Sequence, residues 1–140
     1  EYLTHFALWA IMGSPLIMGC DLRKASEETK KTLLNKDLIA INQDLEARGA
    51  YVIKPLPDAY NENEAFILVK PLADGIFNFS DTQRELSLEF WDMGIPYAAG
   101  VSLSLHDCIT GEELGEFTER FAPVVPSHGC VVVRARIVEK

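Results

Sequence analysis

The chain has 140 residues, of which 48% are hydrophobic, and a formal net charge of −8 from 13 basic and 21 acidic side chains. This length allows one good hydrophobic core, or a small core plus part of another domain, and the apolar content argues against disorder. The acidic balance argues against nucleic acid and anionic membranes as partners, because neither is attracted to an acidic surface. By elimination, an uncharged substrate such as a sugar fits better.

Cysteine usage and hydropathy give further exclusions. Cys20, Cys108 and Cys130 are widely spaced and form no CxxC pair, so we expect buried free thiols rather than a zinc site. The longest apolar stretch, residues 6–12, is far shorter than the roughly 20 residues that a membrane helix needs. The chain begins without a start methionine or basic segment, so localisation cannot be read from it.

Residues 1–44 show helical spacing with one interruption. Residues 1–12 form a run that is apolar nearly all the way round, which predicts a helix that ends at residues 13–15, Gly-Ser-Pro. Residues 16–18, Leu-Ile-Met, are typical of a short strand covered on both faces. A second helix is expected after the N-cap residue Ser26, with apolar residues at helical spacing (Leu34, Leu38 and Ile41). This is a helix, strand and helix without neighbouring strands.

Beyond Asp44 the pattern changes to alternation, which predicts an antiparallel β domain. In residues 84–90 the buried face would carry Leu86, Leu88 and Phe90. The other expected strands are residues 50–54, 65–72, 76–80, 101–106, 113–118 and the last segment from 131. Expected turns are Ala73-Asp74-Gly75, Ser80-Asp81-Thr82 and Ser127-His128-Gly129. Seven or eight short strands favour a sandwich or a small barrel.

The last segment alternates in the same way. Val131, Val133, Ala135 and Ile137 are expected to face inward, and its two arginines are expected to face water (Arg134 and Arg136). The connection at residues 42–49 has no run of Gly, Ser or Pro, so the two parts are expected to pack together.

Three motifs in the first 44 residues stand in a characteristic order. They are LTHFALWAI at 3–11, SPLIMGCDLR at 14–23 and NKDLIAINQD at 35–44. Together they closely resemble glycoside hydrolase family 27, the α-galactosidase or melibiase family. The resemblance continues through LVKPL at 68–72, FNFSD at 77–81, RFAPVV at 120–125 and HGC at 128–130.

The resemblance implies a mostly β fold with two parts. Residues 1–45 would be the C-terminal remnant of a TIM (β/α)8 barrel, namely helix 7, strand 8 and helix 8, and residues 46–140 would be the antiparallel β-sandwich that follows it. The missing neighbours of the strand at 16–18 would then be the earlier barrel strands. The chain is thus identified as the C-terminal part of a family member.

The resemblance also implies chemistry for the whole enzyme. Family members are retaining glycosidases, which need a nucleophilic carboxylate and an acid/base carboxylate about 5 Å apart. Both lie, in the family, on earlier barrel strands, together with the residues that hold galactose, and neither motif is present here. We therefore assign no catalytic, cofactor-binding or metal-binding residue and expect the chain alone to be inactive. The implied partner is a galactoside bound by the missing part, with no cofactor, nucleic acid or membrane; the oligomeric state stays open.

Asp21 is the most tempting catalytic candidate, because TIM-barrel active sites lie at the C-terminal ends of strands. The resemblance instead implies that Asp-Leu-Arg at 21–23 is a structural turn, with Asp21 and Arg23 bridging loop and helix. An acidic group is expected to be a solvated face rather than a carboxylate pair (Glu112, Glu113, Glu116 and Glu119).

Histidines and tryptophans have equally simple interpretations. His5 is expected to be a core or interface residue, and His106 and His128 lie at strand ends without a nucleophile motif. Trp9 belongs to the apolar helix, which leaves Trp91 as the better candidate for stacking on a sugar ring.

The sequence departs from the family pattern after Gly75, where Phe77-Asn78 follows almost at once. This predicts a strand shortened by about five residues, which would leave part of residues 66–72 unpaired. The alternative function is a noncatalytic β-sandwich module with a structural or weak carbohydrate-binding role. Under either function, residues 1–44 should expose an apolar patch, or the first helix should fold back onto the β domain.

Overall fold

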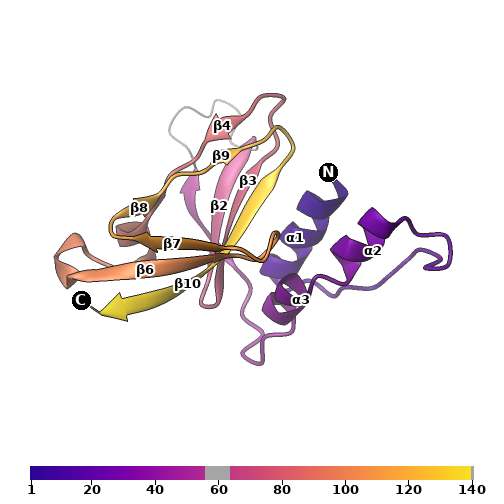
Figure 1. The fold of residues 1–140 in the computed structure, drawn as a ribbon, viewed down its shortest axis with the longest axis horizontal. Helices are drawn as coiled ribbons and strands as arrows, with labels where there is room; N and C mark the ends of the chain where they lie inside the picture. The colour runs from indigo at the N-terminus through magenta and orange to yellow at the C-terminus, as the bar shows by residue number, and fades with distance from the viewer. Residues whose placement is uncertain (56–63, 140) are drawn as a thin grey trace.

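The computed structural model describes residues 1–55 and 64–139 and places three helices on one side of a large antiparallel sheet (Figure 1). The helices come first in the chain: α1 (Tyr2–Met12), α2 (Glu27–Leu33) and α3 (Lys36–Asn42). Helix α1 ends as predicted, because Gly13 adopts a left-handed φ of 71° and its N–H donates to Ala10 O. The fold is mostly β, as predicted.

The expected second helix is divided into two. Ser26 caps α2 as predicted, since its Oγ accepts a hydrogen bond from Thr29 N. Asn35 then caps α3, with its Oδ1 accepting from Leu38 N at 3.0 Å, so a new helix begins where the first would have continued. Leu34 falls at this break and is exposed, whereas Leu38 and Ile41 are buried as predicted.

Residues 16–18 form no strand, so this prediction does not hold in this structure. Ile17 is 87% exposed and Met18 is half exposed. A strand needs a neighbour to satisfy its backbone groups, and the described residues place none beside this segment.

The main sheet has six antiparallel strands in the order β1-β2-β3-β10-β6-β7. Two short ladders, β4-β9 and β5-β8, lie beside it. The strand bounds are β1 (Tyr51–Pro55), β2 (Ala65–Lys70), β3 (Ala73–Asn78), β4 (Arg84–Glu85), β5 (Leu88–Glu89), β6 (Val101–Asp107), β7 (Glu113–Phe117), β8 (Arg120–Phe121), β9 (Val124–Val125) and β10 (Cys130–Glu139). Two 3-10 helices lie between β5 and β6, η1 (Phe90–Met93) and η2 (Tyr97–Ala99).

Each face of the main sheet buries its own hydrophobic cluster. One cluster lies between the sheet and the short ladders and includes Ile67, Ile76, Leu88 and Leu105. The other lies between the sheet and helices α1 and α3, with Ile11 against Phe77 and Val132. Helix α1 therefore packs on the β domain, which is one of the two outcomes expected for the apolar segment.

The β2–β3 hairpin corrects two predictions. Residue pairing runs without interruption from Ala65–Asn78 to Lys70–Ala73, so the turn is Pro71-Leu72 and not Ala73-Asp74-Gly75. Strand β2 also pairs with β1 on its other side, and the expected unpaired edge is not formed. The physical reason is the fixed φ of Pro71, which suits the first central position of a tight turn and lets β3 begin earlier.

The expected strand at 84–90 is two short strands, β4 and β5, and Phe90 already belongs to η1. Leu86, Leu88 and Phe90 are nevertheless buried on one side, as the alternation predicts. In β10 the two arginines point away from the core as expected, but Ile137 is 58% exposed, contrary to its predicted inward position.

A buried amide joins the main sheet to the second layer. Asn78 at the end of β3 donates from Nδ2 to Val125 O at 3.1 Å and to Pro126 O at 3.0 Å, and its Oδ1 accepts from Ser80 Oγ at 2.6 Å. These bonds fix a corner between β3 and β9.

Candidate functional site

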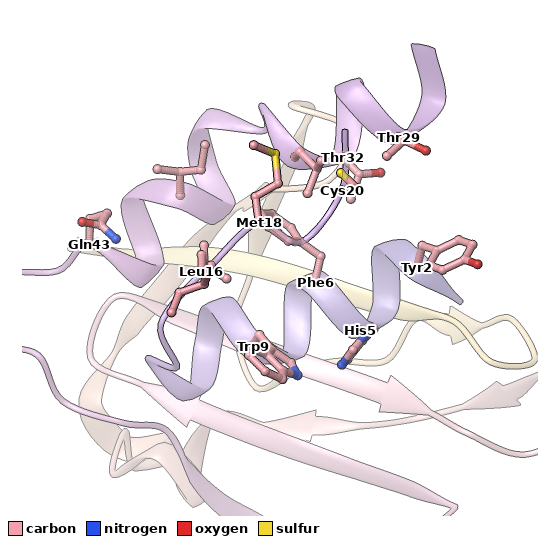
Figure 2. Close-up of a pocket in the computed structure, with 13 residues that line it drawn as sticks. Tyr2, His5, Phe6, Trp9, Leu16, Met18, Cys20, Thr29, Thr32 and Gln43 are labelled. Carbon is pink, nitrogen blue, oxygen red and sulfur yellow. The ribbon is translucent and has the colours of Figure 1, made fainter. Parts of the chain in front are cut away.

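An apolar groove of about 580 Å³ lies between α1, the loop before α2, and the two shorter helices. We define the apolar groove by six of its lining residues (Phe6, Trp9, Leu16, Ile17, Met18 and Ile39). Figure 2 shows Phe6 extending from α1 into the groove and Met18 standing on the loop that borders it. The groove is built from residues 2–43 alone.

The all-round apolar character of α1 explains the groove. One side of the helix, with Ala7, Ala10 and Ile11, is buried against the sheet. The opposite side carries Trp9 and His5, whose rings meet edge to face with centroids 5.4 Å apart (Figure 2). Trp9 and His5 are both exposed, so neither belongs to the core of this chain, and the interface position expected for His5 as the alternative stays a prediction.

Asp21 and Arg23 pair with each other. Arg23 donates from Nε to Asp21 Oδ1 and from Nη2 to Asp21 Oδ2, both at 2.9 Å, in an exposed loop. The guanidinium lowers the pKa of the Asp21 carboxyl. A general acid needs a raised pKa, so this environment does not suit Asp21 for that role. The pair bridges positions within the loop and does not reach a helix.

The other sequence candidates lie on the β domain. All four glutamates of the acidic group are exposed, which is the solvated face that we expected. The backbone of His128 adopts a positive φ of 51°, and its Nε2 lies 3.0 Å from Asp81 Oδ1. Trp91 on η1 is 56% exposed and is thus free of the core, as a stacking residue must be. None of these residues lines the apolar groove.

The cysteines are free, as expected, although not all of them are buried. Cys108 is buried, Cys130 is partly buried and Cys20 is exposed at the apolar groove. Burial raises the pKa of the Cys108 thiol to about 11 and that of Cys130 to about 12. Neither thiol has the lowered pKa that a nucleophilic cysteine needs.

A charged cluster that the sequence did not reveal lies at the contact between α3 and the sheet. Asp37 in the first turn of α3 accepts a hydrogen bond from Arg134 on β10 and lies 3.3 Å from His106 Nε2. His106 Nδ1 lies 2.8 Å from Glu113 Oε1 on β7. Only the packing of α3 against distant strands makes this cluster, so local spacing could not have revealed it.

Two buried charged residues were also missed. Lys70 is 3% exposed, and Asp74 in the middle of the sheet is 4% exposed. Burial raises the pKa of Asp74 to about 7. The sequence pattern assigned Asp74 to a turn, and only the correct hairpin register places it between Val69 and Val133.

Neither a metal cluster nor a membrane-spanning helix occurs in the part of the chain that the structure describes. No group of three or more His, Cys, Asp or Glu side chains in residues 1–55 and 64–139 is placed to hold a metal ion. None of the described helices combines the length and hydropathy that crossing a bilayer requires.

Comparison with known proteins gives a consistent result. A family model described as "Alpha galactosidase A" matches residues 1–44. The chain is 34% identical over 139 residues to "Probable alpha-galactosidase" of Dictyostelium discoideum, which covers 95% of this chain and 35% of the relative. It is also 34% identical over 147 residues to α-galactosidase A of Cellvibrio japonicus, covering 96% of this chain and 35% of the relative.

A solved structure gives the same fold. The crystal structure of α-galactosidase I from Mortierella vinacea superposes with a TM-score of 0.79 over 96% of this chain and 34% of that chain, at 24% identity. At this identity the likeness concerns the fold alone. The chain spans about a third of the length of these relatives.

Proposed function

Because the chain belongs to glycoside hydrolase family 27, the α-galactosidase family, and corresponds to the C-terminal part of its relatives, we propose that it is part of a retaining α-galactosidase. The whole enzyme would hydrolyse terminal α-linked galactose from oligosaccharides and glycoconjugates. The observation that carries this proposal is the 34% identity extending over 95% of the chain, helices and β domain alike.

Within that enzyme, residues 1–45 would be the last helix, strand and helix of the TIM barrel, and residues 46–140 the β-sandwich domain. The apolar groove supports this division. Ile17 and Met18 are exposed in the segment expected to be a barrel strand. Neighbouring barrel strands would pair with this segment and cover the groove.

The reaction would follow the double displacement of retaining glycosidases. One carboxylate attacks the anomeric carbon and forms a galactosyl-enzyme ester, while a second protonates the leaving oxygen and then activates the water that hydrolyses the ester. We place both carboxylates outside residues 1–140. The pairing of Asp21 with Arg23 supports this placement, because that carboxylate already accepts two charge-assisted hydrogen bonds.

The role of this chain would then be structural. Its two hydrophobic clusters suggest how the chain would support the barrel. Helix α1 packs on the sheet through one side and leaves its other side at the groove. The rest of the barrel, packed on the groove, would be joined to the β domain through α1. We therefore propose that the chain holds the end of the barrel in place without contacting substrate.

A second candidate function is a noncatalytic module that binds carbohydrate weakly. Two exposed aromatic residues, Trp91 and Tyr97, favour this function. The Tyr97 hydroxyl also lies 3.5 Å from a carboxylate oxygen, Glu89 Oε2. Aromatic faces cover the apolar side of a sugar ring, and a carboxylate accepts bonds from its hydroxyls. If the chain is retained on a galactoside affinity column without hydrolysing the galactoside, and if Trp91→Ala abolishes that retention, this function is favoured.

A chimera tests the main proposal. Residues 1–140 would replace the matching third of the Dictyostelium discoideum relative, whose activity on an aryl α-galactoside is measured first. We expect the chimera to cleave the galactoside, and we expect Ile11→Asp, which places a charge in the helix-sheet cluster, to abolish that activity. The matched control is Leu45→Asp at a fully exposed position, which should leave activity intact. A folded but inactive chimera would contradict the proposal.

A further inference from the structure

His106 occupies an unusual position between two carboxylates from different elements. On β6 it faces Glu113 of β7 through Nδ1, at 2.8 Å from Oε1. Its other nitrogen, Nε2, lies 3.3 Å from Oδ2 of Asp37, which belongs to the first turn of α3. The imidazole is partly buried, with a side-chain exposure of 24%. One ring thus contacts both the sheet and the helix that packs on it.

The chemistry of imidazole limits when both contacts are favourable. A neutral imidazole carries one N–H, and its other nitrogen is an acceptor, whereas the imidazolium carries two N–H donors. An ionised carboxylate only accepts hydrogen bonds. Because both nitrogens of His106 face carboxylate oxygens, only the protonated ring donates to Asp37 and Glu113 at the same time.

The surrounding charges favour that protonated state. Hydrogen bonding to Glu113 and then to Asp37 raises the pKa of His106. Arg134 and Arg136 of β10 line the same polar cavity, and their positive charges oppose protonation of the imidazole. Arg134, however, already donates a hydrogen bond to Asp37 Oδ1. The charged groups that line this cavity with His106 are therefore one carboxylate from α3, one from β7 and the two guanidinium groups from β10.

We propose that His106 is a proton-controlled clamp that holds the first turn of α3 against the sheet, tight when the imidazole is charged and loosened when it becomes neutral. On losing a proton, the ring keeps the shorter contact, so Nδ1–H still donates to Glu113. The contact with Asp37 is the one that is lost, because Nε2 then presents a lone pair to a carboxylate oxygen. The clamp concerns packing within this chain and does not depend on the proposed glycosidase function.

Other bonds keep α3 attached when the clamp loosens. Asn35 Nδ2 donates to Cys108 O at 2.9 Å at the start of the helix, and Lys70 Nζ donates to Ile41 O at 2.7 Å near its end. The ion pair between Arg134 and Asp37 does not involve the imidazole proton. The expected change is thus local fraying of the first turn rather than detachment. Since α3 contributes Ile39 to the apolar groove, this turn adjoins one wall of the groove.

Proton titration of the full chain followed by NMR tests the clamp. We expect the His106 ring to titrate above the value of about 6.5 that an unperturbed histidine shows. Over the same pH range, the protection factor of the Ile39 amide, which donates to Asn35 O, should fall about two- to fivefold, the size expected for one partly exposed ion pair. The amide of Ile67, deep in β2, should not change.

Three variants separate the clamp from a general effect of charge. Asp37→Asn and Glu113→Gln should each lower the midpoint of the His106 titration, and Asp37→Asn should also remove the pH dependence at Ile39. The control Asp81→Asn removes a carboxylate paired with His128 and should leave His106 unchanged. A wild-type midpoint at or below 6.5 would overturn the proposal, and so would constant protection at Ile39. Both measurements need only the wild-type chain to fold.

Discussion

The ammonium group of Lys70 on β2 donates a 2.7 Å hydrogen bond to the main-chain carbonyl oxygen of Ile41 in α3. Lys70 is almost fully buried, so this bond lies within the contact between helix and sheet. A cation near the C-terminal end of a helix is also favoured by the helix dipole. This bond therefore helps to hold α3 against the sheet.

Replacing this lysine tests the contact. Lys70→Met keeps the apolar stem but leaves the Ile41 carbonyl without its donor, which typically costs about 1–3 kcal/mol. We expect the free energy of unfolding, measured by urea titration, to fall by that amount. Lys24→Met, at an exposed position, is the matched control and should change it by less than about 0.5 kcal/mol. Equal stability of Lys70→Met and wild type would show that the bond is unimportant.

Asp74 predicts a pH dependence of stability. Burial raises its pKa from 3.8 to about 7 in the folded chain, so the unfolded chain releases this proton at lower pH than the folded one. The folded state is therefore penalised increasingly as pH rises from about 4 to about 7, and stability should fall over that range by roughly 2–4 kcal/mol from this group.

Asp74→Asn removes that titration. The variant should be more stable than wild type at pH 8 and should approach wild type near pH 4, as measured by thermal unfolding across pH. Glu85→Gln removes an exposed carboxylate and should leave the pH profile unchanged. If Asp74→Asn destabilises the chain at pH 8, then the carboxylate has a stabilising partner and the expected penalty is absent.

Gly75 tests how closely α1 approaches the sheet. A Cβ at this position would lie 2.5 Å from Phe77 Cε2 and 2.9 Å from Ile11 Cδ1, and both of these side chains are fully buried. We expect Gly75→Ala to cost about 1–3 kcal/mol through overpacking. Gly19→Ala is the control, because a Cβ added there would have no neighbour within 4 Å. A neutral Gly75→Ala would mean that α1 can shift without loss.

The apolar groove should bind a hydrophobic dye such as anilinonaphthalene sulfonate, because exposed apolar surface of this kind associates with apolar ligands. Ile17→Glu introduces a negative charge at the groove and should weaken the dye fluorescence. Leu45→Glu adds the same charge at an exposed residue that does not line the groove and should not. If the wild-type chain does not bind the dye, or if Ile17→Glu does not weaken the fluorescence, the groove is closed in solution.

Local signals in the sequence predicted much of the fold. The glycine end of α1, the Ser26 cap and the strand expected at 101–106 depend on neighbouring residues only, and all three are confirmed. The turn expected at Ala73-Asp74-Gly75 is wrong, because Pro71 suits an earlier tight turn and β3 already begins at Ala73. The strand at 16–18 failed for another reason: strand pairing needs a partner, and the described residues supply none there.

The candidate site was less predictable than the fold. The acidic group of glutamates is exposed as expected, because charge runs in an acidic protein usually face water. The cluster of Asp37, His106, Glu113 and Arg134 joins residues up to 97 positions apart. The order of strands β10, β6 and β7, together with the packing of α3 against them, brings these residues together. Long-range register of this kind leaves no mark in the local sequence.

We propose that the reacting carboxylates lie outside residues 1–140. The most direct measurement is the release of nitrophenol from an aryl α-galactoside by the purified 140-residue chain. We predict no release above the buffer blank at any pH from 4 to 8, for the wild type and for Asp21→Asn alike. Hydrolysis by the wild-type chain that Asp21→Asn abolishes would contradict this claim and would place the chemistry on the chain itself.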